Sequence, residues 1–267
     1  MVKITTTASN RITSGIKSFK RILNSAISRD INESDTAVIV TDMFSDIFGY
    51  DKFTEITFEH AIQGAYCDLA IRPNGKTRIV VEIKAIGVEL KDNHVRQGTN
   101  YATNEGCDWL ILTNGAVWRF YKILFSKPIS KELIAEVDFT KITARSKSAI
   151  EIIYAFSTEG TAGDILETFA EKQEILGRFF ISAAILSDPS INEIRKQLRR
   201  ASPGIKIDAE QIRKVIVDEV LKREVLEGDK AAVAQKRMTK AVSMPLRKTA
   251  KIEAVLNADK SIVAVAV

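Results

Sequence analysis

The stretch that decides the fold of this chain is RIVVEIKA, at residues 78–85. Apart from Glu82 and Lys84, the residues from position 79 onward are apolar, and so apolar a run is typical of a strand in the interior of a sheet. Because side chains alternate along a strand, Glu82 and Lys84 share one face. Charges are costly in such a strand, so this pair indicates a functional role.

The register of a hairpin decides whether a third charged residue joins this pair. Asp68 lies in the preceding predicted strand, residues 64–71, and the turn that follows contains Pro-Asn-Gly at residues 73–75. A two-residue turn would set Asp68 opposite the residue before Glu82, on the other face. A three-residue loop would set it opposite the position two before Glu82, on the same face. The order proline, asparagine and glycine favours the three-residue loop, so the sequence predicts that Asp68, Glu82 and Lys84 converge.

Two carboxylates and an ammonium on one half-buried surface are suited to phosphodiester hydrolysis. Neighbouring carboxylates repel each other unless a cation lies between them. Oxygen ligands without Cys or His favour Mg²⁺ or Mn²⁺, and such an ion activates water and neutralises charge on a phosphate. Lys84 adds a compact positive charge near the attacking water or the scissile phosphate. The alternative is a surface hairpin with one salt bridge, because a bare Glu-x-Lys tripeptide is common.

The surrounding pattern predicts an α/β or α+β core over about residues 30–125. Apolar residues at helical spacing indicate helices, and Asn114-Gly115 is a strong signal for a tight hairpin turn. Glu33 lies one turn before the apolar stripe of the second helix, and we expect it to point inward. The predicted helices are 11–29, 32–49 and 92–104, and the predicted strands are 54–58, 64–71, 78–85, 109–113 and 116–123.

Beyond residue 127 the pattern changes to helices, and the chain becomes basic after Leu221. We therefore expect an α/β domain at residues 1–127 and a helical, basic region at residues 128–267. The predicted helices of this region are 130–136, 146–157, 163–177, 179–187, 191–200 and 208–227.

The composition restricts the classes of function. The 267 residues are 45% hydrophobic and 27% charged, as in ordinary soluble proteins. No apolar run approaches the roughly 18 residues that cross a bilayer, so no membrane partner is expected. Cys67 and Cys107 lack metal-type spacing, and two isolated thiols indicate the reducing cytoplasm. The net charge of +5 is compatible with a polyanionic partner.

A second motif lies on the helix that follows the Lys84 strand. Gln97 and Tyr101 are four residues apart and share a helical face. Taken alone, this spacing indicates only a packed tyrosine and an exposed glutamine. Together with Asp68 and Glu82-x-Lys84, however, the set resembles the PD-(D/E)xK nuclease superfamily, in its branch with a Q-x-x-x-Y motif.

The resemblance extends to a particular family and to one more acid. Glu33 resembles the acid that the superfamily places on its first core helix. The segments that resemble the N-terminal nuclease domain of type I restriction enzyme R subunits are residues 32–50, 66–68, 81–84 and 112–118.

The resemblance implies a sheet flanked by helices and Mg²⁺-dependent DNA cleavage in restriction or genome defence. It implies that Asp68 and Glu82 hold the metal, with the Ile83 carbonyl as a further ligand. Lys84 would position or activate water, and Glu33 would assist the metal shell.

For the helix motif, the resemblance implies that Gln97 and Tyr101 touch the DNA backbone or support the site. Two departures stand out. The family's proline before the aspartate is Cys67 here, and an R subunit continues into a helicase motor that this chain lacks. We therefore expect a metal-dependent DNA endonuclease without its own motor. The alternative is a non-catalytic DNA-binding or accessory subunit of a restriction or prophage system, and a homodimer is plausible for two-strand cutting.

Overall fold

The computed structural model describes residues 4–62, 65–125 and 128–243 of the chain. Its internal contacts divide the chain into two compact units, Met1–Glu174 and Ile175–Val267. Each unit has apolar cores of its own. Within the described ranges, no helix is both long and apolar enough to span a lipid bilayer.

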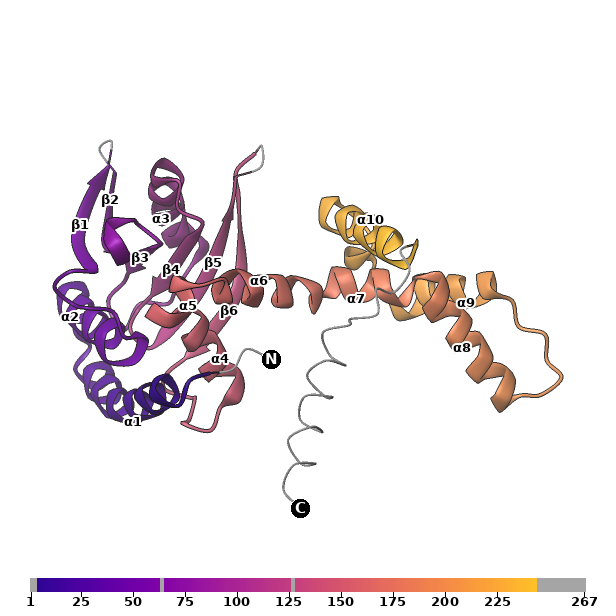
Figure 1. The fold of residues 1–267 in the computed structure, drawn as a ribbon, viewed down its shortest axis with the longest axis horizontal. Coiled ribbons are helices and arrows are strands. Elements are labelled where there is room, and N and C mark those ends of the chain that lie inside the picture. Colours follow the sequence, from indigo (N-terminus) through magenta and orange to yellow (C-terminus); the bar gives the residue numbers. More distant parts are fainter. Residues whose placement is uncertain (1–3, 63–64, 126–127, 244–267) are drawn as a thin grey trace, which may run out of the picture. The chain divides into compact units, whose positions relative to one another are not determined.

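The first unit is built on a mixed six-stranded sheet whose strands follow one another in chain order (Figure 1). Neighbouring strands are antiparallel except β3 and β4, which are parallel. A parallel pair needs a crossover connection, and helix α3 supplies it. The strands are β1 (Ile56–Ile62), β2 (Ala65–Ile71), β3 (Ile79–Ile83), β4 (Trp109–Thr113), β5 (Val117–Leu124) and β6 (Ser130–Asp138).

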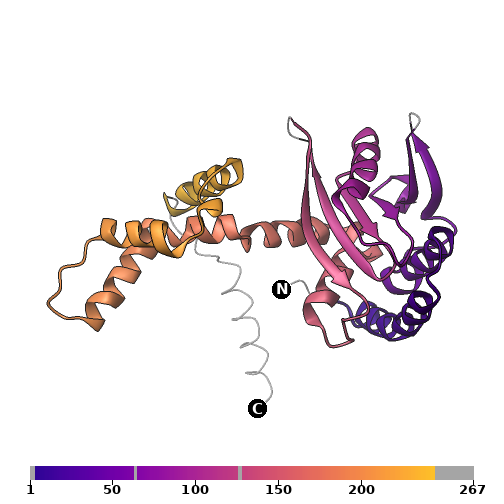
Figure 2. The same ribbon diagram turned by 180° about the vertical axis from the view of Figure 1, so that it is seen from behind.

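Helices cover both faces of this sheet. In two opposite views α3 lies on one side of the strands and α1 on the other (Figure 1, Figure 2). Val80 and Leu110 pack in the core under α3, whereas Val81 and Trp118 belong to the larger core on the opposite face. A mixed sheet flanked by helices confirms the predicted fold class. The helical elements are α1 (Thr6–Arg29), α2 (Glu33–Met43), the π-helical turn η1 (Phe44–Phe48), α3 (Asp92–Glu105), α4 (Lys147–Ala155), α5 (Thr158–Ala162) and α6 (Ile165–Ile175).

The second helix begins and ends where its sequence predicts. The Asn32 side chain accepts a hydrogen bond from the Asp35 amide at 2.9 Å and so caps the start of α2. The π-helical turn η1 continues the helix to Phe48, and Gly49, with φ of 86°, ends it in the left-handed conformation. Glu33 is therefore held in the first turn of α2.

In the hairpin between β2 and β3, Asp68 and Glu82 lie on the same face of the sheet, as predicted. The register of the two strands, however, differs from the predicted one. Leu69 pairs with Val81, so the loop is longer than three residues. Residues 73–75 form a 3-10 turn with two left-handed positions. The same register, extended by one residue, places Asp68 opposite Glu82. The difference from the prediction is two residues, and because the side-chain period of a strand is also two, Asp68 still shares the face of Glu82.

The helix predicted at residues 130–136 is wrong, because this segment belongs to strand β6. It pairs antiparallel with β5 along its whole length, with an irregularity between Phe120 and Tyr121. As the edge strand it buries little beyond Val137, so its alternation is weak. β6 completes the sheet, and residues of α4 and α6 pack in the larger core. The compact unit therefore extends past the boundary expected after residue 127.

The second unit is helical, as expected for the C-terminal region. Phe180 and Ala183 of α7 pack against Ala234 of α10. A separate cluster joins Ile191 of α8 to Ile212 of α9. The elements are α7 (Arg178–Ile185), α8 (Asp188–Ala201), α9 (Ala209–Val215), the turns η3 (Ile216–Val220) and η4 (Arg223–Val225), and α10 (Asp229–Ser243).

Candidate active site

Asp68 is anchored where strands β2 and β3 part. The last backbone pair between these strands is Leu69 with Val81. Beyond it, Oδ2 of Asp68 accepts a hydrogen bond from the Ile83 amide at 2.6 Å. A carboxylate thus takes the place of a backbone acceptor, and this bond fixes the Asp68 side chain beside the end of β3.

Glu82 is the most unusual group of the site, because its side chain is fully buried, with 0% exposure. Oε1 accepts a hydrogen bond from Nζ of Lys84 at 2.8 Å. Oε2 has no hydrogen-bond partner among the described residues. Burial, followed by the negative charge of Asp68, raises the pKa of Glu82 to about 7, although Lys84 opposes the shift.

Lys84 brings its ammonium to the same place. Nζ donates to Oε1 of Glu82 and to the Ile83 carbonyl, both at 2.8 Å, and lies 3.7 Å from Oε2 of Glu33. Burial alone would lower the pKa of Lys84, but the bond to Glu82 and the charges of Glu82, Asp68 and Glu33 outweigh it, so the pKa is raised. The ammonium therefore stays charged at neutral pH.

Glu33 reaches the site from another element, α2, but it does not point inward as expected. Its side chain is 53% exposed, and its contact at the site is with Lys84. Glu33 is exposed because it lies in the first turn of α2, before the part of the helix that packs in the core. The buried positions of that part include Thr36 and Val40.

The two residues of the Q-x-x-x-Y motif have different environments. Tyr101 is buried in the core under α3 and interacts with Cys67, the neighbour of Asp68. Burial raises the pKa of Tyr101, and it raises the pKa of Cys67 to about 12, so both groups remain protonated. Gln97 is exposed on the surface of α3. The motif thus consists of a buried tyrosine that contacts the neighbour of Asp68 and an exposed glutamine on the surface of the helix.

Sequence reasoning missed the residues that hold the loop after β3. The Asn114 side-chain amide donates to the carbonyls of Ile86 at 3.3 Å and Val88 at 2.9 Å. The Lys84 amide donates to the Thr113 carbonyl at 2.8 Å. The pair Asn114-Gly115 predicts a turn, but nothing local to it indicates a partner in a distant loop.

The donor set fits a hard divalent cation. Within the described part of the chain, no group of three or more His, Cys, Asp or Glu side chains is placed to hold a metal. Glu82 and the Ile83 carbonyl nevertheless contact the same ammonium, Asp68 is close enough for its charge to act on Glu82, and one buried carboxylate oxygen of Glu82 is unsatisfied. Mg²⁺ characteristically takes one or two carboxylates and keeps several waters, so these residues suit it.

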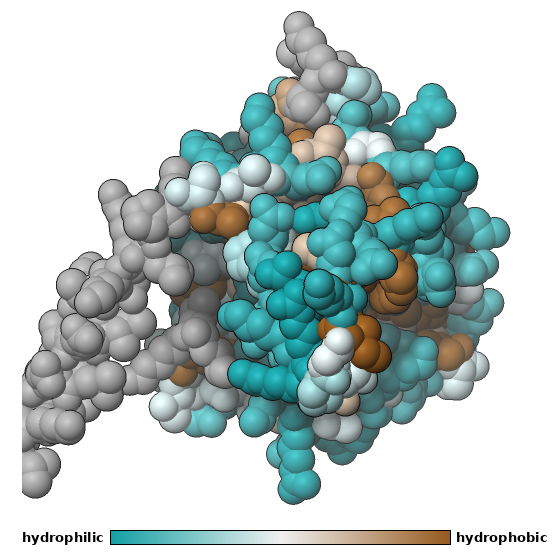
Figure 3. Space-filling view, turned by 90° about the vertical axis from the view of Figure 1, so that its right-hand side faces the viewer, coloured by the Kyte–Doolittle hydropathy of each residue, from teal (hydrophilic) through white to brown (hydrophobic). Residues whose placement is uncertain are grey.

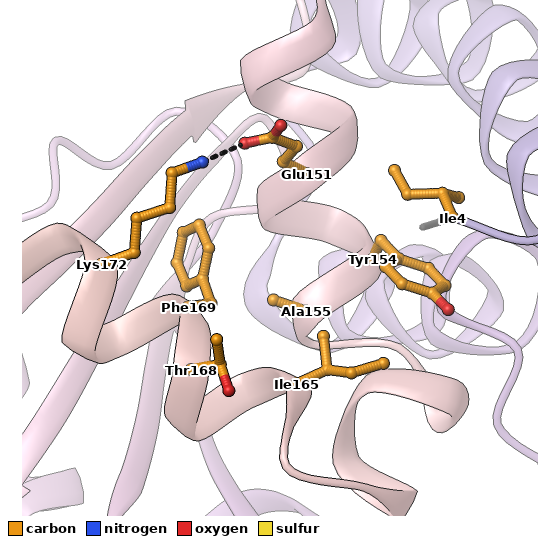
Figure 4. Close-up of a pocket in the computed structure, with 8 residues that line it drawn as sticks. All are labelled: Ile4, Glu151, Tyr154, Ala155, Ile165, Thr168, Phe169 and Lys172. Carbon is orange, nitrogen blue, oxygen red and sulfur yellow. Dashed lines mark hydrogen bonds and ion pairs between the residues drawn. The ribbon is translucent and has the colours of Figure 1, made fainter. Parts of the chain in front are cut away.

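An apolar pocket of about 440 Å³ lies elsewhere in the first unit, between α4 and α6 (Figure 4). Tyr154 and Phe169 face it, and Ile4 borders it. The two charged residues at its lining, Glu151 and Lys172, pair with each other at 3.0 Å. It contains no convergent catalytic groups, so the charged cluster at the end of β3 remains the candidate active site.

The first unit is an α/β domain with a restriction-endonuclease-like core, a mixed sheet flanked by helices. Residues 41–137 match the protein family described as "Type I restriction enzyme R protein N terminus (HSDR_N)". The matched segment includes every predicted site residue except Glu33. It resembles the N-terminal region of restriction enzymes, which indicates a restriction-related nuclease role. No curated protein and no solved structure matches the chain.

The buried carboxylate predicts how stability depends on pH. The pKa of Glu82 is about 7 in the folded protein, against an ordinary value of 4.5. Its stabilising contribution is therefore complete below pH 4.5 and is lost as the pH rises through 7. Between pH 5 and pH 8.5 the free energy of unfolding of the metal-free protein should fall by on the order of 2 to 3 kcal/mol. The Glu82→Gln variant should not show this loss. Urea unfolding of both proteins at the two pH values measures this difference.

The matched control is Glu89→Gln, which changes an exposed glutamate in the loop after β3. Its pH dependence should equal that of the wild type. Parallel loss of stability in the wild type and Glu82→Gln would mean that Glu82 ionises normally in the folded state.

Proposed function

We propose that this chain is a metal-dependent endodeoxyribonuclease that acts in restriction or genome defence in the cytoplasm. The observation that carries the proposal is the fully buried Glu82 carboxylate, which has one unsatisfied oxygen and lies beside Asp68 and Lys84. A buried carboxylate of this kind is costly unless a cation compensates it. The match of residues 41–137 to an R-protein N terminus supports the same reaction.

In this proposal Asp68, Glu82 and the Ile83 carbonyl would hold Mg²⁺ or Mn²⁺. The bound ion supplies Lewis acidity, which lowers the pKa of water and neutralises charge on the scissile phosphate. Asp68 stays in place because the Ile83 amide holds its carboxylate. Lys84 contributes a permanent positive charge beside the reacting phosphate or the attacking water.

The helix α3 provides the second layer of the proposed site. Tyr101 supports the backbone next to Asp68 through its contact with Cys67. Gln97 lies one turn earlier on the exposed surface of the same helix, where an amide can donate to a DNA phosphate. The test of the function is incubation of the chain with duplex, single-stranded and branched DNA in the presence of Mg²⁺ or Mn²⁺.

A basic face on α8 supports DNA as the partner. Lys196, Arg199 and Arg200 follow the i, i+3, i+4 spacing and so lie on one side of the helix. All three are exposed; Lys196 pairs with Glu193 at 3.2 Å, whereas within the described chain neither arginine forms an ion pair. Figure 3 shows a space-filling view of the chain, and most of the surface drawn in colour there is hydrophilic. Guanidinium groups on such a face suit phosphate contacts.

Neutralising this face should weaken DNA binding in a salt-dependent manner. Each phosphate contact adds about 0.9 to the slope of log K against log salt. Arg199→Gln/Arg200→Gln should therefore reduce the slope by about 2. Fluorescence anisotropy with labelled duplex in EDTA measures binding without cleavage.

Lys222→Gln/Arg223→Gln removes the same charge from the same unit and is the matched control; both of its residues are exposed. Its slope should change less than that of the α8 variant. Equal slopes for the two double variants would show that the basic face of α8 makes no more phosphate contacts than the control residues do.

The same basic face favours a second candidate function, a non-catalytic DNA-binding or accessory subunit of a restriction system. Such a protein would bind DNA equally well with Asp68→Ala and would cleave only with partner subunits, or not at all. Co-purification of the chain with a methyltransferase or helicase subunit tests the accessory role. Sedimentation with and without DNA tests the proposed homodimer.

A further inference from the structure

The Lys84 ammonium is enclosed by oxygens from two elements. Nζ is 2.8 Å from both Oε1 of Glu82 and the Ile83 carbonyl oxygen, which belong to β3. It is 3.7 Å from Oε2 of Glu33 on α2. The Lys84 side chain is only 18% exposed, so this arrangement is a partly desolvated ion pair with strong hydrogen bonds.

Two of these three oxygens belong to residues that would hold the divalent cation. Nζ carries a full positive charge, and its contact with Oε1 of Glu82 is a close ion pair. An ammonium and a small divalent ion cannot both lie against the same carboxylate oxygen and carbonyl without strong repulsion. A cation on the Ile83 carbonyl therefore requires Nζ to leave that carbonyl, and a cation on the unsatisfied Oε2 of Glu82 repels Nζ from Oε1.

Glu33 is placed to receive the displaced ammonium. Its carboxylate already lies within ion-pair distance of Nζ, it belongs to a different element from Glu82, and it is half-exposed. A small rotation of the Lys84 side chain would shorten that contact. The charge of Glu33 acts on Glu82 less than that of Lys84 does, and its ion-pair contact is with Lys84, so we expect most of its influence on the cation to pass through Lys84.

We propose that Lys84 is an internal counter-ion that competes with the divalent cation, and that Glu33 is a positioning residue that holds the Lys84 ammonium once the cation binds. This inference rests on the proposed metal-dependent function. It differs from a role of Glu33 in the metal shell, because a residue of that shell would affect binding to the same extent whether or not Lys84 is present.

The experiment is a calorimetric titration of Mn²⁺ into the full chain at pH 8, without DNA. Lys84→Met should bind Mn²⁺ about tenfold more tightly, since a charge-assisted bond no longer has to be broken. Glu33→Gln should bind it roughly threefold to tenfold more weakly. In the Lys84→Met background, Glu33→Gln should have a much smaller effect. Asp35→Asn, an exposed acid in the same turn of α2, is the matched control and should bind like the wild type.

Thermal melts show which variants are folded, and Lys84→Gln replaces Lys84→Met if the latter unfolds. Lys84→Arg keeps the positive charge and should bind Mn²⁺ like the wild type. Unchanged or weaker binding by the neutral Lys84 variants would overturn the inference, as would a full effect of Glu33→Gln in the Lys84→Met background. If neither the wild type nor any variant binds Mn²⁺, the proposed metal-dependent function fails instead.

Discussion

Asp68→Ala and Lys84→Ala are each expected to lower the rate of Mg²⁺-dependent DNA cleavage by about a thousandfold, the scale of losing one preorganised charge from a transition-state site. Asp68 is held beside the end of β3 by the Ile83 amide, and the Lys84 ammonium lies next to Glu82, so both charges are at the proposed site. Single-turnover cleavage of a supercoiled plasmid and of a linear duplex measures the rates. DNA affinity in EDTA should stay within about twofold of the wild type, because DNA binding draws on many phosphate contacts.

The chain offers a matched pair of controls. Asp42 and Lys52 form an ion pair at 2.6 Å on the same unit, with side chains 43% and 39% exposed. Asp42→Ala and Lys52→Ala remove the same two types of charge away from the site and should cleave at the wild-type rate. Equal cleavage by the site variants would point to a contaminating nuclease. Absence of cleavage by the wild type on every DNA form would favour the accessory or purely binding role.

Trp118→Ala should lower the free energy of unfolding by about 3 to 5 kcal/mol, the range for truncating a large buried aromatic residue. The Trp118 ring is fully buried, at 5.2 Å from the ring of Phe44 and 5.1 Å from that of Phe48. Its Nε1 donates to the Gly115 carbonyl at 2.8 Å. Trp118 therefore packs η1 against strand β5. Because η1 continues α2, this contact also helps to position α2, which carries Glu33. Urea unfolding followed by circular dichroism measures the change.

Phe53→Ala is the control for this prediction, because Phe53 is 91% exposed. Its effect should stay within about 0.5 kcal/mol, as for most surface substitutions. If Trp118→Ala were equally mild, the aromatic cluster would not be the element that joins the α2 and η1 segment to the sheet.

The features that depend on neighbouring residues could be predicted from the sequence. The apolar run around Glu82 predicted a central strand, and β3 is buried along its whole length. The shared face of Asp68 and Glu82 was also predicted, although the hairpin register was not. A slip of two residues preserves the face of a side chain, whereas a slip of one would have reversed it.

The features that depend on distant partners could not be predicted. Strand β6 was predicted as a helix over residues 130–136, because an edge strand lacks the burial that would sharpen its alternation. The same strand moved the boundary of the first unit beyond residue 127. Glu33 was expected to point inward because its position matches the apolar stripe, but the first turn of α2 extends beyond the core.

By itself, the sequence determined that Glu82 and Lys84 would emerge on one face of a buried strand, because the pleat of a strand is a local property of the backbone. Only the tertiary structure decided that the Ile83 amide would hold Asp68, that Glu82 would lose all contact with solvent, and that α2 would bring the Glu33 carboxylate to within 3.7 Å of the lysine. These contacts join residues far apart in the chain, and their geometry follows from how the helices pack on the sheet.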